Sequence, residues 1–524
     1  MKENSENLQY NSCISKGICS VNPRILALQN VLVLYLCMCA KYCLKLLEKK
    51  ALSDETADCI INMTEISISN PDFSEECFMK GIDSLKEILI ESIDKYNDLY
   101  EKEDFKGENL YESDIYKKCE NLVNTIKLGE EILRERISGL TAEMRDIYKI
   151  ILITAKSISI NLMDLKSFDK KSQSGLKTLL KLISSVDANN TDTEALKQVI
   201  LEGCSCNTEL MLQLHEAQES RYGKQGIYDV SYTTTPSKAV LVVGSNIREL
   251  ETVLESLKDT DIDVYTHDEM MAAHTFPKFK EYKNLKGQYG YGVENCLIDF
   301  ATFPGPIILT KHSLHNIENL YRGRLFTTDV NFYKGVIKIE NNNYKPVSLS
   351  AEEAKGFKKG KTCETVKVGY DFQKCIDSID IQFYSKKYKK IVVIGLKEYS
   401  EKDRKYFEKL VKKLKTDTLI VSFSYSFEQS NLLHFNTCFD SFAVVRIFKH
   451  LLDYNVPLSV FLLKCGRNTI AEILHFGRFE GVKAFLGDCE PVIIDPSLMG
   501  TLEGVFGVRK MGNPIKDAEE VNNL

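Results

Sequence analysis

Four side chains that could bind a metal ion stand close together in the segment VYTHDEMMAAHTFP at residues 264–277. They are His267, Asp268, Glu269 and His274, and they follow an apolar run typical of a buried strand. Imidazole and carboxylate groups are common ligands of transition metals, so this spacing indicates a candidate metal site at the end of the strand. The competing interpretation of Glu269 is a carboxylate at the start of a helix, where the helix dipole favours negative charge.

The cysteines are a weaker indication of metal binding than this segment. Six of the sixteen lie in helical patterns, where we expect them to fill the core as small apolar residues: Cys37, Cys39, Cys43, Cys59, Cys77 and Cys119. Another set in the second half of the chain shows no closed metal-ligand spacing, so a rebuilt site remains only the alternative there: Cys296, Cys363, Cys375, Cys465, Cys489, His312 and His315. Cys13 and Cys19 form an isolated pair that is a weak metal signal by itself.

Length and charge narrow the class of protein. With 524 residues and 44% hydrophobic content, the chain can bury several cores. A net charge of −6 argues against a nucleic-acid partner. The most apolar run, residues 31–40, is shorter than the roughly 20 residues of a membrane-spanning helix, and no signal-peptide pattern is present. We therefore expect no membrane association and a cytoplasmic location, in which the thiols stay reduced.

Three regions must position these residues. From residue 23 to about 219, apolar residues recur every three or four positions with little glycine or proline, which predicts packed helical bundles. After residue 226, two segments each combine an apolar strand, one glycine and an amphipathic helix, at 239–257 and 391–411. We predict an α + α/β protein: an N-terminal segment and helical domain at 1–225, then α/β domains with mainly parallel sheets at 226–380 and 381–524.

Further buried strands are predicted at 306–309, 418–421 and 491–494. Neither strand–glycine turn carries G-x-G-x-x-G, and the chain has no G-x-x-x-x-G-K-[ST] motif. Nucleotide binding is therefore only a minor hypothesis.

Several motifs, taken in order, resemble those of the hybrid cluster proteins. These proteins are also called prismane proteins or hydroxylamine reductases and are related to the carbon monoxide dehydrogenases. The motifs are AVLVVGSNIREL (239–250), THDEM (266–270), AHTFP (273–277), KEYKNLKGQYG (280–290), FATFPG (300–305), LFTT (325–328), CFDS (438–441), HFG (475–477) and LGDCEPV (486–492). The resemblance covers most of the chain from residue 222 onward and implies the three-part architecture predicted above.

The resemblance also implies two iron–sulfur centres. One is a 4Fe-4S cubane held by four cysteines near the N-terminus, and the other is a hybrid Fe–S–O cluster that reduces hydroxylamine or nitric oxide where the domains meet. Cys13 and Cys19 have the spacing of the last two cubane cysteines, whereas residues 1–4 read MKEN where the first two would lie. Soft thiolates hold the irons of such clusters, while histidine and carboxylates bind the harder, more open irons.

Most ligands of the hybrid cluster are replaced in this chain. Glu269 takes the place of the family's cluster glutamate and Cys438 that of one thiolate, while His267 and His274 are not the usual ligands. The family's histidine corresponds to Ser245. Two further cysteines correspond to Ser313 and Leu396. Weaker substitutes at or beside the remaining positions are His312, Tyr425 and Cys465.

Two functions follow from this resemblance. The first is an anaerobic iron–sulfur oxidoreductase that reduces hydroxylamine or nitric oxide near Glu269 and Cys438. The alternative is a cluster-deficient, non-catalytic homologue that acts as a binding or regulatory subunit, in a homo-oligomer or in a hetero-oligomer with an intact homologue. A nickel-containing carbon monoxide dehydrogenase site would need still more cysteines than the chain has.

Overall fold

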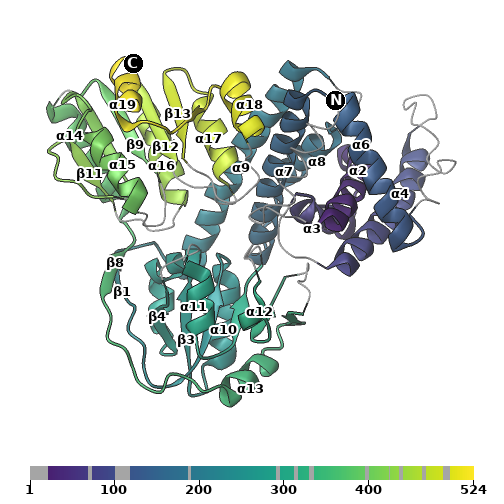
Figure 1. Ribbon diagram of the computed structural model, residues 1–524, viewed down its shortest axis with the longest axis horizontal. Coiled ribbons are helices and arrows are strands. Elements are labelled where there is room, and N and C mark those ends of the chain that lie inside the picture. Colours follow the sequence, from purple (N-terminus) through teal and green to yellow (C-terminus); the bar gives the residue numbers. More distant parts are fainter. Residues whose placement is uncertain are drawn as a thin grey trace, which may run out of the picture.

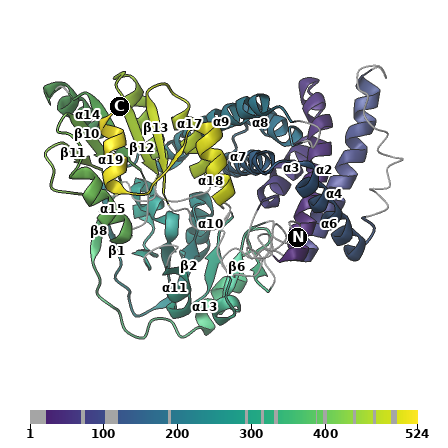
Figure 2. The same ribbon diagram turned by 45° about the horizontal axis from the view of Figure 1, so that its top comes forward.

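The computed structural model describes residues 22–68, 74–100, 119–186, 191–290, 295–311, 317–329, 335–386, 388–395, 401–423, 425–435, 441–462, 468–487 and 496–524. Its elements form a helical part and two α/β parts, arranged around a common centre (Figures 1 and 2). The predicted fold class, a helical domain followed by two α/β domains with mainly parallel sheets, is confirmed. The exact domain boundaries at 225 and 380 stay predictions.

Seven helices make up the described helical part. They are α2 (Pro23–Glu48), α3 (Asp54–Ile66), α4 (Glu75–Leu99), α6 (Leu122–Gly139), α7 (Ala142–Ser167), α8 (Gln173–Ser184) and α9 (Thr193–Tyr222). Each begins where a side chain can accept a backbone N–H, as Ser53, Ser74 and Thr141 do for α3, α4 and α7. Helix α2 packs against α3, α4, α6 and α8 and is therefore apolar on nearly every side.

Helix α2 is also the one helix among the described residues that is long and apolar enough to cross a membrane by length and composition. Its most apolar window is 78% buried inside the protein. Burial by neighbouring helices explains its composition, because a helix covered all round has no polar face to maintain.

The first α/β part holds a six-stranded parallel sheet in the order β4-β3-β2-β5-β6-β7. The strands are β2 (Lys238–Val243), β3 (Ile262–His267), β4 (Leu285–Gln288), β5 (Ile307–Leu309), β6 (Leu325–Thr327) and β7 (Ile337–Lys338). Between them lie α10 (Ile247–Leu257), the 3-10 helices η2 (Asp268–Thr275) and η3 (Pro277–Glu281), α11 (Cys296–Thr302) and α12 (Asn319–Arg322), and α13 (Lys345–Glu353) follows β7.

The second α/β part repeats this arrangement in the order β11-β10-β9-β12-β13-β14, again with every strand parallel. Its strands are β9 (Lys390–Ile394), β10 (Thr418–Ser422), β11 (Leu432–His434), β12 (Leu458–Leu462), β13 (Val482–Leu486) and β14 (Arg509–Lys510). Its helices are α14 (Phe372–Lys386), α15 (Glu401–Val411), α16 (Ser441–Leu452), α17 (Thr469–Gly477), α18 (Pro496–Phe506) and α19 (Pro514–Asn522). A short antiparallel pair, β1 (Tyr228–Ser231) with β8 (Thr365–Val368), lies outside both large sheets.

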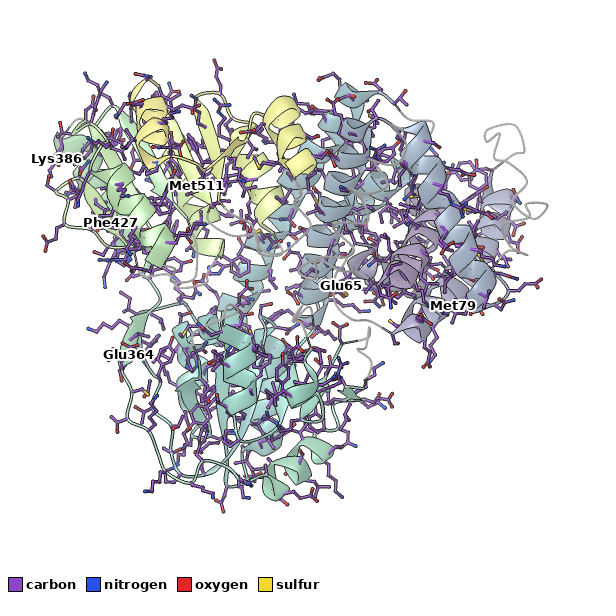
Figure 3. The ribbon with its side chains drawn as sticks, viewed as in Figure 1. Glu65, Met79, Glu364, Lys386, Phe427 and Met511 are labelled. Carbon is purple, nitrogen blue, oxygen red and sulfur yellow. The ribbon has the colours of Figure 1, made fainter. Side chains whose placement is uncertain are left out.

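Both sheets are buried on two faces, which explains their continuous apolar strands. In β2, Val240 and Val242 face a core formed with α10, while Leu241 and Val243 belong to the core on the other face. The strands predicted at 306–309 and 418–421 are confirmed as β5 and β10. The one predicted at 491–494 lies outside the described residues. The dense packing of side chains in all three parts is visible in Figure 3.

In each sheet the chain begins at a central strand, adds strands toward one edge, and then returns to add strands toward the other edge. In the first sheet the reversal lies between β2 and β5, and in the second between β9 and β12. Open α/β sheets bind their ligands outside the carboxyl ends of the strands at such a reversal. The fold therefore directs attention to the residues that follow β2, β3, β5, β9, β10 and β12.

Candidate functional site

The positions that the sequence marks as cluster ligands follow these strand ends. Ser245 comes after β2, Glu269 after β3 and Tyr425 after β10. In the first sheet, Val243 pairs with both His267 and Leu309, so the ends of β2, β3 and β5 are neighbours. His312, Ser313, Leu396, Cys438 and Cys465, together with Cys13 and Cys19, lie outside the described residues, and their roles stay predictions.

The turn after β2 is held by its backbone conformation and by the side chain of Asn246. Gly244 adopts a φ of 121°, which favours glycine, and leads into Ser245, whose half-buried side chain forms no hydrogen bond with the described residues. The next residue, Asn246, caps α10 by accepting from the Glu249 N–H at 3.1 Å and donates to Asp164 Oδ1 on α7 at 2.9 Å. The turn is thereby tied to the helical part.

A buried histidine–carboxylate pair ends strand β3. His267 is fully buried, and its Nε2 lies 3.1 Å from Asp299 Oδ2 on α11. The Phe300 ring contacts the imidazole edge-on, with centroids 5.2 Å apart. The other ring nitrogen, Nδ1, is buried and has no hydrogen-bond partner among the described residues. This pair was not predicted from the sequence, because 32 residues separate its members.

The residues that follow His267 have unusual backbone and exposure. Asp268 has a φ of 60°, a conformation that costs free energy in residues other than glycine and is least unfavourable for asparagine and aspartate. Glu269 is half-buried in the first turn of η2, and its carboxylate forms no hydrogen bond or ion pair with the described residues. The helix-start interpretation of Glu269 therefore agrees with its position, and its carboxylate remains available to a ligand.

His274 is engaged in a separate polar network. Its Nε2 lies 2.8 Å from Thr266 Oγ1, and the ring is buried. With its nitrogen toward Thr266, the Gln288 amide donates to Thr266 Oγ1 at 2.6 Å and accepts from the Asp268 N–H at 3.1 Å. Burial, and to a smaller extent the charge of Lys280, lowers the pKa of His274 to about 3. The ring is therefore neutral near pH 7, and its Nε2 is already engaged by Thr266.

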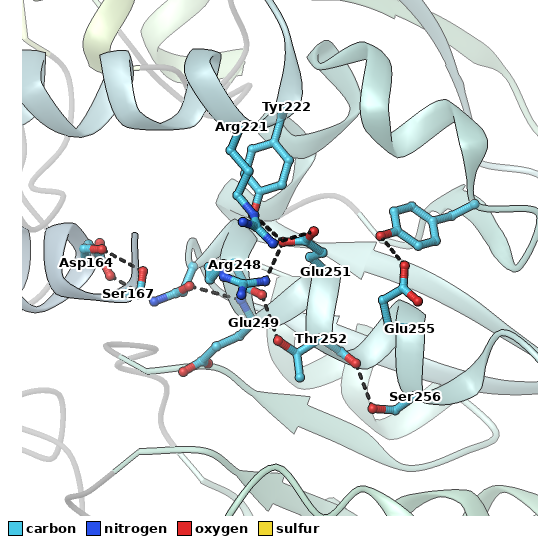
Figure 4. A network of polar contacts seen from close by, with 12 residues as sticks. Asp164, Ser167, Arg221, Tyr222, Arg248, Glu249, Glu251, Thr252, Glu255 and Ser256 are labelled. Atoms are coloured by element: carbon cyan, nitrogen blue, oxygen red, sulfur yellow. Dashed lines mark hydrogen bonds and ion pairs between the residues drawn. The ribbon is translucent and has the colours of Figure 1, made fainter. Parts of the chain in front are cut away.

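Helix α10 joins the first sheet to the helical part through carboxylates (Figure 4). Glu249 accepts from the Lys311 N–H after β5 at 3.0 Å and from Thr328 Oγ1 after β6 at 2.5 Å. Figure 4 shows Glu251 facing Arg221 and Tyr222 from the end of α9. These contacts fix the strand ends relative to α9.

At the corresponding edge of the second sheet, Tyr425 lies in an apolar core. Its ring stacks with Phe407 of α15 at 5.9 Å and lies 6.1 Å from Phe427, and its backbone N–H donates to Ser422 Oγ at 3.1 Å. Phe427 is labelled in Figure 3. Tyr425 belongs to a different sheet from Glu269, and its part in iron binding stays a prediction.

Buried polar groups also connect the helical part to both α/β parts. Asn161 of α7 donates to Asn207 Oδ1 of α9 at 2.9 Å and to Asn468 Oδ1, just before α17, at 3.1 Å. Lys156 of α7 is buried and donates to the Ile68 carbonyl at 3.0 Å. Burial lowers the pKa of Lys156 to about 8, although the charges of Glu65 and Asp329 oppose this effect. Helical periodicity alone would not have distinguished these residues from solvent-facing ones.

The described cysteines are all free thiols. Burial raises the pKa of Cys43 and Cys59 to about 11, which disfavours the thiolate that a metal requires. Cys37, Cys39, Cys77 and Cys119 are buried and Cys59 is half-buried, as core filling predicts. Cys296 and Cys375 are buried and Cys363 is half-buried. Within the described ranges, no three histidine, cysteine or acidic side chains converge as a metal site.

Comparison with known proteins supports the resemblance seen in the sequence. A hydroxylamine reductase from Thermodesulfovibrio yellowstonii is 26% identical over 97% of both chains. One from Zymomonas mobilis is 24% identical over 97% of this chain and 96% of its own. A solved chain of acetyl-CoA synthase/carbon monoxide dehydrogenase, from a structure described by the NiZn[Fe4S4] and NiNi[Fe4S4] clusters in its alpha subunits, aligns with a TM-score of 0.47 at 12% identity, covering 97% of this chain and 84% of that chain. Residues 8–443 match the model of the Prismane/CO dehydrogenase family, and this chain belongs to that family.

Proposed function

We propose that this chain is a hydroxylamine reductase-like protein with a degenerate hybrid-cluster site, and that it acts as a cytoplasmic binding or regulatory homologue. The observation that carries the proposal is the donor set at the strand ends. Serine follows β2 where the resemblance implies histidine, and Ser313 and Leu396 stand where it implies cysteines. Glu269 and Cys438 are the implied ligands that remain.

Donor chemistry explains why these replacements matter. An iron–sulfur core depends on thiolates, whose soft sulfur binds iron strongly. A serine hydroxyl stays protonated near pH 7 and is a poor substitute, and a leucine side chain has no donor atom. Beside Ser245, the Asn246 side chain is already engaged by Asp164 and by the cap of α10. The residues present therefore do not fit a complete hybrid cluster.

The second candidate function is an iron–sulfur oxidoreductase that reduces hydroxylamine or nitric oxide under anaerobic conditions. It is favoured by relatives named hydroxylamine reductase that match the chain over 97% of its length. A 4Fe-4S centre would need ligands beyond Cys13 and Cys19, either from a second chain or from other cysteines. In both candidates, an intact homologue is the proposed macromolecular partner.

The iron content separates the two candidates. The full chain should be purified anaerobically beside the Thermodesulfovibrio yellowstonii relative, and iron, acid-labile sulfide and visible absorption should be measured for both. We expect at most the roughly four irons of a cubane in this chain and no hydroxylamine reduction above that of a free-iron control. More than about four irons per chain, together with reduction that depends on the protein, would contradict the proposal.

A further inference from the structure

We infer that an exposed lysine face on α15 docks onto an acidic face on α4 of a second copy of this chain. The lysine face consists of Lys402, Lys405, Lys409, Lys412 and Lys413. The acidic face consists of Glu76, Asp83, Glu87, Glu91, Asp94 and Asp98. Neither helix carries a position that the resemblance assigns to a cluster ligand, so the inference goes beyond the proposed function and does not depend on it.

The lysine face follows the solvent-facing side of α15. Its members recur every three or four residues, so they project from one side of the helix. The other side carries Phe407, Leu410 and Val411, which are buried in a core shared with β9, β10 and α19. Because that side is buried, the helix holds the five ammonium groups toward solvent. Residues 401–415 carry a net charge of +4, whereas the whole chain carries −6.

The acidic face has the same construction on α4. Its members recur at intervals of three, four or seven residues, so they too share one side of the helix. The other side carries Phe78, Ile82, Leu85 and Leu89, which are buried where α4 packs against α2. Residues 75–99 carry a net charge of −4. The two helices therefore present faces of equal and opposite net charge.

The two faces lie toward opposite ends of the molecule. In Figures 1 and 2, α15 lies with the second α/β part toward one end of the longest axis, and α4 lies at the other end. They cannot meet within one chain, so contact between them requires two chains joined head to tail. Such a contact leaves one lysine face and one acidic face uncovered, and further copies can add to them.

The faces also agree in length and spacing. Residues 402–413 and residues 87–98 each rise about 16 Å along their helices. Within both spans the charged side chains recur every three or four positions. Opposite charges can therefore be placed side by side along the whole contact, which is the arrangement that selects a protein partner and speeds its encounter.

Part of each face remains without a partner inside its own chain. Some charges are paired along the helix: Lys412 lies 2.7 Å from Glu408, and Glu91 lies 2.5 Å from Lys95. Four others form no ion pair or side-chain hydrogen bond with another described residue: Lys409, Lys413, Glu87 and Asp98. These four charges are available to a second chain.

The lysine face fits an acidic protein better than a nucleic acid. Arginine forks and free aromatic rings strengthen binding to phosphates and bases, but on α15 Arg404 is half-buried and the Tyr406 hydroxyl donates to Asp517. Glu401 and Glu408 stand beside the lysines and would repel a phosphate backbone. The acidic face of α4 instead offers separate carboxylates at matching intervals.

Sedimentation velocity of the full chain tests the association. The mass should rise with protein concentration at about 0.01 M salt, where the Debye length is about 30 Å. It should return to that of a single chain at about 1 M salt, where the Debye length is about 3 Å. Because each contact leaves two faces uncovered, the mass at low salt should pass beyond that of a dimer.

Charge reversal at the four available positions tests the pairing. Lys409→Glu with Lys413→Glu cancels the net charge of residues 401–415, and Glu87→Lys with Asp98→Lys cancels that of residues 75–99. Each double variant alone should associate at least about tenfold more weakly than the unaltered chain. An equal mixture should form a dimer and nothing larger, because each variant supplies only the face that the other has lost.

The matched control is Lys358→Glu with Lys359→Glu, at exposed positions between α13 and β8. It changes the net charge by the same amount as reversal of the two α15 lysines and should associate as the unaltered chain does. A single-chain mass for the unaltered protein at low salt, or for the mixture of variants, would overturn the inference. A labelled DNA duplex and the Thermodesulfovibrio yellowstonii relative are added in the same buffer, and binding of either without self-association would also overturn it.

Discussion

The neutral, buried ring of His274 should make the first α/β part sensitive to acid. Its pKa is about 3 in the folded chain, against an ordinary value of 6.5, because burial disfavours the charged ring. Between these values the unfolded chain binds a proton that the folded chain does not. The stabilising contribution is therefore complete above pH 6.5 and is lost as the pH falls toward 3.

The size of this effect follows from the two pKa values. At pH 5 the unfolded histidine is 1.5 pH units below its pKa of 6.5, and each unit corresponds to about 1.4 kcal/mol. The folded ring stays neutral at this pH. His274 should therefore remove about 2 kcal/mol of stability between pH 8 and pH 5. Because carboxylates also titrate in acid, the contribution is measured as a difference between the unaltered chain and His274→Gln.

The assay is urea unfolding at pH 8 and pH 5, with deuterium uptake of peptides from residues 262–290 reporting the part that contains His274. His274→Gln should lose about 2 kcal/mol less than the unaltered chain over this pH range. Thr266→Val is the control, because it removes the hydrogen bond to the ring and keeps the titrating group. It should lower stability at both pH values by a similar amount. An equal pH dependence in His274→Gln and the unaltered chain would refute the reasoning.

Three further substitutions test the packing and the contacts between the parts. Glu251→Gln should cost about 2 kcal/mol in urea unfolding, since two arginines and a buried tyrosine hydroxyl share this carboxylate. Gly129→Ala should cost about 3 kcal/mol because its Cβ would lie 2.0 Å from the Ala27 carbonyl, whereas Gly139→Ala, with open space around it, should be nearly neutral in thermal unfolding. Asn468→Ala should cost about 1–3 kcal/mol and speed limited proteolysis between the helical and second α/β parts, since it removes an acceptor from two buried asparagines.

The sequence predicts the architecture well because the relevant signals are local. Continuous apolar runs with a following glycine indicate strands buried on both faces, and both sheets have them. Likewise, apolar recurrence every three or four residues suffices for the helical part. Several ligand positions inferred from the resemblance also follow strand ends, because the motifs that contain them include the preceding strand.

The polar pairing could not be predicted, because it depends on contacts between distant residues. His267 and Asp299 are 32 residues apart, and Asn161 meets Asn468 across 307 residues. Asn161 does not differ in its local sequence pattern from an asparagine on a solvated helix face, and Asn468 does not differ from an ordinary residue just before a helix. Lys156 likewise reads as a surface lysine, although only 6% of it is exposed. The buried contacts of such residues can be recognised only when the helices and sheets are placed relative to one another.

These contacts explain how the scaffold can persist after its cluster ligands change. Helices α7 and α9 bind both α/β parts: Asp164 and Arg221 contact the first, and Asn161 contacts the second. Asp146 of α7 adds hydrogen bonds from two hydroxyls of α18. None of these bonds involves a position that the resemblance assigns to a metal ligand. The arrangement of the three parts is therefore stabilised by buried hydrogen bonds and apolar packing, so replacing a cluster histidine or cysteine removes a donor atom without removing the contacts that hold the edge of the sheet in place.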